Sequence, residues 1–258
     1  MSWRHETTRR RALGLIAGSV VGPLPQLAPQ LAGDPAQAQT ANQTTADHDV
    51  DLNLALGVDA SGSVNQVRFD LQKQGYVAAF SNRQVLAAVR SGPHAAIGVT
   101  MYQWTGPGMQ APVVLWSRVT NEASIDRLSS AIAAAPRRLF HGGTSISGAI
   151  DFGVTVLNAS PFRGARRVID ISGDGANNRG HPVQSARDAA VKAGININGL
   201  PIMEVEPDLE NYYHENVVGG PGAFVIAAAT FEDFGNAIRR KLIQEIAHRP
   251  SSEMMRPA

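Results

Sequence analysis

Oxygen-bearing side chains stand at three points of the sequence where a strand-like run ends or where small residues hold a loop open. Two are carboxylates and three are hydroxyl groups, and in chain order they are Asp59, Ser61, Ser63, Thr144 and Asp174. Such oxygens form a hard ligand set, which suits Mg²⁺ or Mn²⁺ better than zinc or copper. We therefore expect these five residues to bind one divalent cation.

The spacing of these residues explains how they would converge. In Asp-x-Ser-x-Ser, alternate side chains of a chain that turns from strand into helix can aim at one point above a sheet. Asp174 follows the buried run 167–172, and ligands of open α/β sheets bind at the carboxyl ends of strands. Singly, Ser61 or Ser63 could cap a helix and Asp174 could occupy a turn. The combination of all three segments favours a metal site.

The elements that position these residues alternate between strand-like apolar runs and segments of helical period. Expected strands cover 51–58, 95–104, 112–119, 167–172, 195–202 and 223–228, and expected helices cover 64–80, 84–89, 121–134, 145–158, 183–193, 209–216 and 231–247. This order is typical of an α/β domain with a mainly parallel sheet. Gly106-Pro107-Gly108 separates the second and third runs, so we expect an antiparallel hairpin at one sheet edge.

The N-terminal residues predict a targeting segment. A basic cluster, Arg9-Arg10-Arg11, precedes a short apolar run, and Ala36-Gln37-Ala38 offers a small-x-small cleavage site. We expect a signal peptide over 1–38, which resembles the twin-arginine type, with a general secretory signal as the alternative. Residues 39–49 then form a linker, 50–248 one domain and 249–258 a tail. The protein would be exported, either periplasmic or secreted.

Composition excludes several classes of function. The 258 residues include no cysteine, which removes disulfide frameworks, thiol nucleophiles and zinc ribbons. The formal net charge is only +1, and cleavage of the leader would remove more positive than negative charge. We therefore expect no nucleic-acid partner. The apolar run of the leader is too short to span a bilayer, so we expect no membrane span in the mature chain.

With these residues in their three loops, the chain resembles the von Willebrand factor A-like domains from about residue 50 to 247. Their metal-ion-dependent adhesion site consists of Asp-x-Ser-x-Ser, a Thr and an Asp, all matched here in order; within the family the chain looks most like a branch of exported bacterial proteins. The resemblance implies a Rossmann-like three-layer sandwich with helices on both faces of the sheet. It also implies a non-enzymatic domain whose metal keeps one position open for an Asp or Glu carboxylate of a partner protein.

An enzyme alternative is a haloacid-dehalogenase-like metal-dependent phosphatase that uses Asp59 and Asp174. That chemistry wants a second Asp two residues after the first as general acid, and here the position is Ser61. It also wants a phosphate-binding lysine near Asp174, and none is suitably placed in the sequence. Among neighbouring residues, we expect a solvated acidic loop at 204–208, and either an exposed patch or half-buried packing for Tyr212, Tyr213 and His214.

Overall fold

The computed structural model describes residues 48–247, which form a five-stranded sheet in the order β3-β2-β1-β4-β5. The strands are β1 (Asp49–Asp59), β2 (Ile97–Trp104), β3 (Gln110–Val119), β4 (Arg163–Gly173) and β5 (Asn196–Pro201). The helices are α2 (Gln66–Phe80), α3 (Arg83–Arg90), α4 (Glu122–Ala134), α5 (Ile146–Asn158), α6 (Val183–Lys192), α7 (Leu209–Tyr212) and α8 (Phe234–Ala247), with a π-helix, η1, at Tyr213–Val217.

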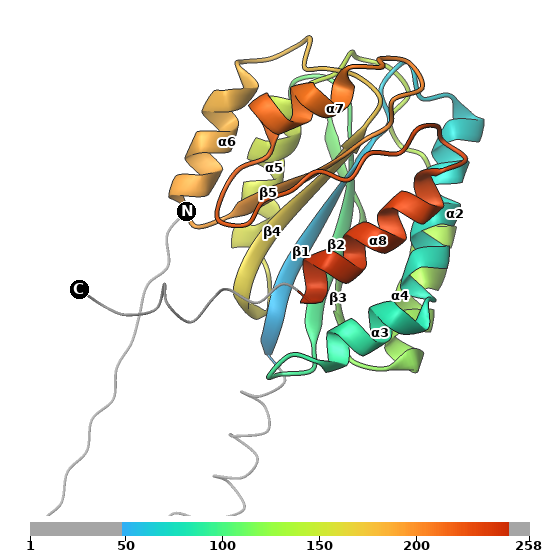
Figure 1. The fold of residues 1–258 in the computed structure, drawn as a ribbon, viewed down its shortest axis with the longest axis vertical. Helices are drawn as coiled ribbons and strands as arrows, with labels where there is room; N and C mark the ends of the chain where they lie inside the picture. The colour runs from blue at the N-terminus through green and yellow to red at the C-terminus, as the bar shows by residue number, and fades with distance from the viewer. Residues whose placement is uncertain (1–47, 248–258) are drawn as a thin grey trace, which may run out of the picture. The chain divides into compact units, whose positions relative to one another are not determined.

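The sheet lies between two layers of helices (Figure 1). Side chains of β1 alternate between the two cores that these layers enclose. Leu52, Leu54 and Leu56 join the core beneath α2, α3, α4 and α8, whereas Ala55 joins the core beneath α5, α6 and η1. Because both faces of β1 are covered, the strand needs the nearly continuous apolar run that the sequence shows. The expected three-layer α/β architecture is confirmed.

The antiparallel pair at the sheet edge is also confirmed. β2 pairs with β1 in parallel and with β3 in antiparallel, with Ile97 opposite Val119 and Trp104 opposite Gln110. The turn between them contains Gly108 at φ +68°, a conformation that side chains other than glycine rarely adopt. All other strand pairs of the sheet are parallel. The carboxyl ends of β1 and β4 therefore meet at one edge, where Asp59 and Asp174 stand.

The expected strand at 223–228 is wrong. This segment runs beside β5 but forms only isolated bridges with it, Gly199 to Val225 and Ile202 to Ala228. Two features interrupt the ladder. The Phe224 N–H donates to the side chain of Asn198 at 2.8 Å instead of to a strand carbonyl, and Pro201 has no N–H to donate.

Two helix boundaries also differ from expectation. The helix expected over 209–216 is a short α-helix, α7, followed by the π-helix η1. The closing helix starts at Phe234 rather than at residue 231, because residues 231–233 form a turn whose Asp233 carbonyl accepts the N–H groups of Asn236 and Ala237.

The closing helix α8 carries a buried ion pair into the core. The Lys241 ammonium group lies 2.7 Å from Asp170 on β4 and 3.2 Å from Glu245 one turn further along α8, and all three side chains are almost fully buried. Asn198 on β5 donates to both carboxylate oxygens of Glu245, at 2.8 and 2.9 Å. The polar groups of α8 are thus joined to the two strands beneath it.

The expected signal peptide, most of the linker and the tail lie outside the described residues. Within 48–247, no helix has the length and apolar character that a membrane span requires.

Candidate metal centre

The loop after β1 brings the first three predicted ligands together. The Asp59 side chain is fully buried, and its Oδ1 accepts the N–H of Ser61 at 2.7 Å. The Ser61 and Ser63 hydroxyl oxygens lie 3.2 Å apart. Ser61 is buried and Ser63 is exposed, so the loop runs from the end of the sheet out to the protein surface. Asn65 then caps α2 by accepting the Arg68 N–H, which fixes where the loop ends.

The loop after β4 meets this group of side chains directly. Ser63 donates to Asp174 Oδ1 at 2.6 Å, and the Asp174 N–H points to Asp59 Oδ2 at 3.4 Å. Gly173, just before Asp174, has no room for a side chain, because a Cβ there would lie 2.9 Å from Asp59 Oδ2. Two carboxylates and two hydroxyl groups from segments more than a hundred residues apart therefore share one point at the carboxyl ends of β1 and β4.

Thr144 completes the group from a third loop. Its carbonyl accepts the N–H groups of Asn178 and Arg179 at 2.9 and 3.1 Å, and its own N–H donates to Asn178 Oδ1. These bonds tie the Thr144 loop to the chain after Asp174. The Thr144 hydroxyl oxygen lies 3.7 Å from the point that a Cβ on Gly175 would occupy. The structure thus gathers all five predicted residues at one edge of the sheet.

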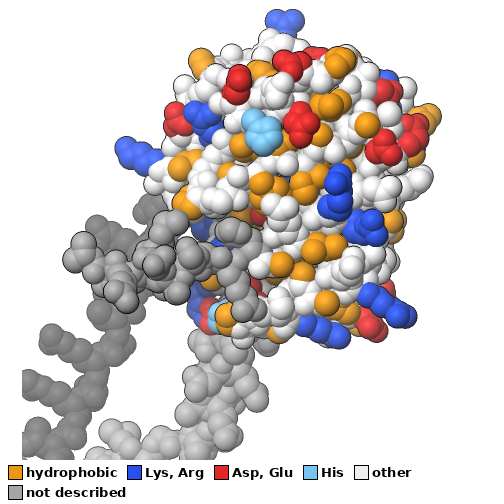
Figure 2. Space-filling view, viewed as in Figure 1, with side chains coloured by type: hydrophobic (Ala, Val, Ile, Leu, Met, Phe, Trp, Pro, Cys, Tyr) orange, Lys and Arg blue, Asp and Glu red, His pale blue; other side chains and the backbone are white. Residues whose placement is uncertain are grey.

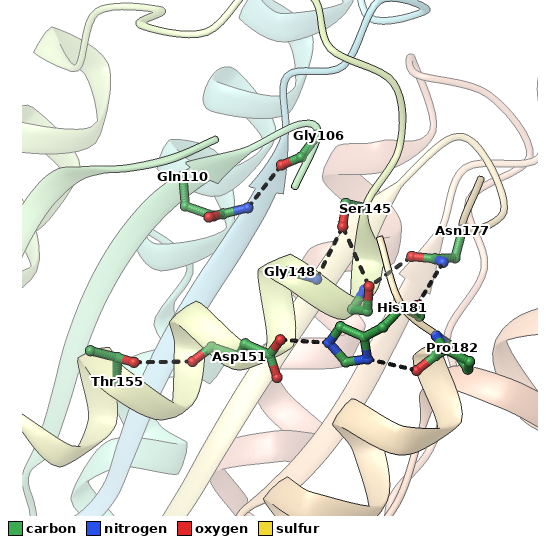
Figure 3. A network of polar contacts seen from close by, with 10 residues as sticks. Gly106, Gln110, Ser145, Gly148, Asp151, Thr155, Asn177, His181 and Pro182 are labelled. Atoms are coloured by element: carbon green, nitrogen blue, oxygen red, sulfur yellow. Dashed lines mark hydrogen bonds and ion pairs between the residues drawn. The ribbon is translucent and has the colours of Figure 1, made fainter. Parts of the chain in front are cut away.

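A network of polar contacts behind the Thr144 loop keeps it against the Asp174 loop (Figure 3). Ser145 caps α5 by accepting the Gly148 N–H at 3.2 Å, and Asn177 accepts the Ser147 N–H at 3.0 Å. Asn177 also donates to the carbonyl of His181, whose Nε2 lies 2.7 Å from Asp151 on α5. The start of α5 and residues 177–181 are therefore held together by side chains that lie next to the candidate ligands without belonging to them.

Burial has the largest effect on the pKa values of the two carboxyl groups of the candidate site. Burial, and secondly the neighbouring Asp174 carboxylate, raises the pKa of Asp59. Burial also raises the pKa of Asp174, although the Ser63 hydroxyl and the Arg68 guanidinium act against it. Asp174 Oδ2 is buried and has no hydrogen-bond partner among the described residues. The fold therefore buries two neighbouring carboxyl groups, and the Arg68 guanidinium acts on Asp174.

This donor set fits a hard divalent cation. The unpartnered Asp174 Oδ2, the adjacent hydroxyl groups of Ser61 and Ser63, the Thr144 hydroxyl group near Gly175 and the buried Asp59 are all oxygen ligands, and two carboxylates balance one divalent charge. Across residues 48–247, no group of three or more His, Asp or Glu side chains is placed to hold a metal ion. A metal at this edge would therefore depend on the hydroxyl groups as well as on the two carboxylates.

Acidic side chains near the candidate site are more structured than the sequence suggested. Glu204 forms an ion pair with Arg68 and accepts the Phe231 N–H, while Glu206 accepts the Ala176 N–H at 3.1 Å. The same Arg68 donates to the Ser63 carbonyl at 2.9 Å. The acidic loop 204–208 is thus exposed but attached to both ligand-bearing loops. These attachments depend on contacts with Arg68 and Ala176, which are distant in sequence, so the spacing of residues in the sequence does not predict them.

The lysines give the phosphatase alternative no support. Lys73 donates to the carbonyls of Ala133 and Ala135, and Lys241 is committed to its buried ion pair with Asp170. Lys192 ends α6, away from the loops that carry the candidate ligands. The chain contains these three lysines and no others.

Solved structures share the fold at low sequence identity. The pilus adhesin SpaC from Lactobacillus rhamnosus GG aligns over 76% of this chain and 31% of its own, with a TM-score of 0.52 and 15% identity. Proximal thread matrix protein 1 from the mussel byssus aligns over 77% of this chain and 48% of its own, with a TM-score of 0.53 and 14% identity. A von Willebrand factor type A structure from Catenulispora acidiphila aligns over 76% of this chain and 43% of its own, with a TM-score of 0.51 and 11% identity. The chain spans less than half the length of each.

These likenesses establish a von Willebrand factor A-like fold. A comparison with curated protein sequences gives no match. A family described as "Protein of unknown function (DUF1194)" matches residues 49–250, and the chain belongs to that family.

Proposed function

We propose that the domain is a non-enzymatic, metal-dependent protein-binding module. Asp59, Ser61, Ser63, Thr144 and Asp174 would hold Mg²⁺, or Mn²⁺, and an Asp or Glu of a partner protein would complete the coordination. The observation that carries the proposal is the buried, unpartnered Asp174 Oδ2 beside a second buried carboxylate and the hydroxyl groups. Support also comes from a structure of the mussel protein described as having a zinc-occupied MIDAS motif, with a TM-score of 0.51 and 15% identity.

Each part of the site has a distinct task in this proposal. A bound divalent ion would supply an electrophilic centre for one further carboxylate. Asp59 and Asp174 neutralise its charge, and the hydroxyl groups add neutral oxygen ligands that leave it electron-poor. The Arg68 contact to the Ser63 carbonyl and the Arg137 contact to the Ala60 carbonyl, at 2.9 and 3.2 Å, hold the loop that presents the two serines.

The surface around this loop has the character of a protein-binding surface. Four large hydrophobic side chains are exposed within 48–247, and three of them flank the candidate site: Val67, Phe140 and Val205. Arg137 stacks on the Phe140 ring at 5.1 Å while it donates to the Ala60 carbonyl, so the aromatic side chain is held next to the metal loop. Exposed aromatic and apolar side chains with a charged border are typical of such interfaces.

Charge is unevenly distributed around the same end of the molecule. Figure 2 shows most of the acidic side chains visible on this face over the end where α7 lies in Figure 1. The exposed Glu204, Glu206 and Asp208 belong to that end. We propose that the partner brings its carboxylate to the metal from the opposite side, where Arg137 and Arg138 precede Phe140, because the acidic loop would repel it.

Export of the protein belongs to the same proposal. A signal peptide at 1–38, of twin-arginine type, would direct the domain at 50–248 to the periplasm or the exterior, with 39–49 as a linker and 249–258 as a tail.

The decisive experiment is calorimetric titration of Mg²⁺ and Mn²⁺ into the chelator-treated domain. Asp174→Ala is the test variant, and Asp126→Ala, on an exposed residue of α4, is the matched control. We expect one-site binding to the wild-type protein and to the control, and none to Asp174→Ala. Equal binding to all three proteins, or none to the wild type, would refute the metal site.

A second experiment addresses the partner. Envelope proteins that bind the wild-type domain in Mg²⁺ but neither in chelator nor to Asp174→Ala are the expected partners. Binding that is unaffected by the metal and by the substitution would contradict a bridging carboxylate.

A further inference from the structure

Tyr213 leaves its hydroxyl group without a partner beneath the candidate metal site. The side chain is fully buried, and its OH forms no hydrogen bond with the described residues. A buried hydroxyl group without a partner costs stability, and such groups in folded proteins usually have a reason to persist. The neighbouring indole Nε1 of Trp104 is likewise buried and unpaired. Two hydrogen-bond donors therefore lie unused in one part of the core.

Two glycines clear the path of the Tyr213 ring. A Cβ on Gly199, in β5, would lie 2.5 Å from the ring carbon Cδ1, and a Cβ on Gly173, in β4, would lie 3.1 Å from the hydroxyl oxygen. The ring thus packs across the middle of β5 and reaches the end of β4, and glycine at both positions leaves room for it. Tyr213 is also the first residue of η1, the π-helix within 48–247, and single π-helical turns are often found at functional sites.

The Tyr213 hydroxyl oxygen and Asp59 Oδ2 approach one common point next to Gly173. The Gly173 Cβ position lies 3.1 Å from the Tyr213 hydroxyl oxygen, 2.9 Å from Asp59 Oδ2 and 3.0 Å from Trp104 Cζ2. A phenol, an indole and a carboxylate oxygen therefore converge on the Cα of Gly173, where no side chain separates them. The only described hydrogen bond to Asp59 Oδ2 is the long one from the Asp174 N–H, at 3.4 Å, whereas Oδ1 is firmly held by Ser61.

We propose that Tyr213 is a positioning residue of the metal site, whose hydroxyl group donates to Asp59 Oδ2 when a cation occupies the site. The inference rests on the proposed function, since it assigns an outer partner to a residue of the same site. With Oδ1 held by Ser61 and Oδ2 by Tyr213, the carboxylate plane is fixed toward the other ligands. Partners of this kind orient ligands and typically contribute about 10- to 100-fold to metal affinity.

The test compares two variants that each remove one buried phenol oxygen. Tyr213→Phe deletes the unpaired hydroxyl group and keeps the ring. Tyr102→Phe is the matched control, because Tyr102 is equally buried but donates to the Ala149 carbonyl at 2.8 Å, on α5 and away from the ligand loops. Mg²⁺ affinity is measured by calorimetry, and thermal stability is measured in chelator.

The two variants should change different properties, one the Mg²⁺ affinity and the other the thermal stability. We expect Tyr213→Phe to weaken Mg²⁺ binding about 10-fold or more with no loss of melting temperature in chelator, because no paired hydrogen bond is lost. Tyr102→Phe should lower the melting temperature and leave the Mg²⁺ affinity unchanged. Wild-type affinity in Tyr213→Phe, or equal weakening in both variants, would overturn the positioning role while leaving the metal site intact. Absence of Mg²⁺ binding in the wild-type protein would instead refute the proposed function itself.

Discussion

Replacement of Asp59 by Asn should stabilise the metal-free domain at neutral and alkaline pH. Burial raises the pKa of Asp59 from the ordinary 3.8 to about 7, with the Asp174 carboxylate as the second cause. A carboxylic acid with a raised pKa in the folded state favours folding most below pH 3.8, and this contribution is lost as pH rises to about 7. The buried, ionised carboxylate therefore lowers the stability of the folded state, and a neutral Asn side chain does not carry this cost.

The size of this effect follows from the same values. A tenfold change in proton affinity corresponds to 1.36 kcal/mol, so the difference between 3.8 and about 7 gives an upper limit of about 4 kcal/mol. Asn keeps the bond from the Ser61 N–H through its carbonyl oxygen, but its amide group replaces Oδ2 and faces the Asp174 N–H donor. Such a mismatch costs about 1–3 kcal/mol. We expect a net gain of about 2 kcal/mol at pH 8.

Urea denaturation in chelator, from pH 4 to pH 8, measures this difference. The advantage of Asp59→Asn over wild type should grow as pH rises to about 7 and then level off. Asp126→Asn, at an exposed position of α4, should match wild type throughout. In saturating Mg²⁺ the order should reverse, because a ligand at 100 times its Kd stabilises the wild-type fold by about 2.7 kcal/mol.

Two results would refute this reasoning. One is an Asp59→Asn variant that is less stable than wild type in chelator at pH 8. The other is a stability difference that does not change with pH, since it would show that the Asp59 carboxylate is not what lowers the stability of the folded state.

Three further predictions concern the scaffold and the leader. Lys241→Met removes the cation from the buried Asp170 and Glu245 carboxylates and should lower the free energy of unfolding, measured with urea, by about 3–5 kcal/mol. Arg240→Met, on the exposed side of α8, should lower it by less than about 0.5 kcal/mol. Similar values for both variants would contradict the buried ion pair. Asn121→Ala removes the cap of α4, which accepts the Ser124 N–H, and should cost about 1 kcal/mol by the same assay, so an unchanged midpoint would exclude a stabilising cap. Replacing Arg9 and Arg10 by Lys should retain precursor in the cytoplasm of the host, as judged by fractionation and immunoblotting, and normal export would argue against a twin-arginine signal.

The sheet was predictable because its central strand is apolar on both faces. The run 51–58 needs no tertiary knowledge to be read as a buried strand, and β1 extends it by only a few residues. The hairpin was predictable from its glycine-rich turn. The segment 223–228 was not, because the loss of its ladder depends on Asn198 and Pro201 in a different strand.

The five candidate ligands were predictable, because the carboxyl ends of parallel strands meet at one edge of a sheet, whereas the contacts around them were not. Asp59, Ser61 and Ser63 lie close in sequence, and their shared end of a strand could be inferred from the apolar run. The burial of Tyr213 and the pairing of Arg68 with Glu204 depend on contacts between distant segments, so no periodicity reports them. Lys241 shows the same limit. A lysine on an amphipathic closing helix is expected in solvent, and only the Asp170 carboxylate on β4 explains why it is buried.

The buried lysine also determines the longitudinal position of α8. Apolar packing alone tolerates a helix that slides along its axis, because one leucine or isoleucine can replace another. If α8 moved by one turn, about 5.4 Å, either Glu245 or Ala237 would take the place of Lys241 opposite Asp170. The first arrangement sets two buried carboxylates against each other, and the second leaves Asp170 without a cation. The closing helix thus has one favoured position along its axis, and a shift by one turn in either direction is unfavourable.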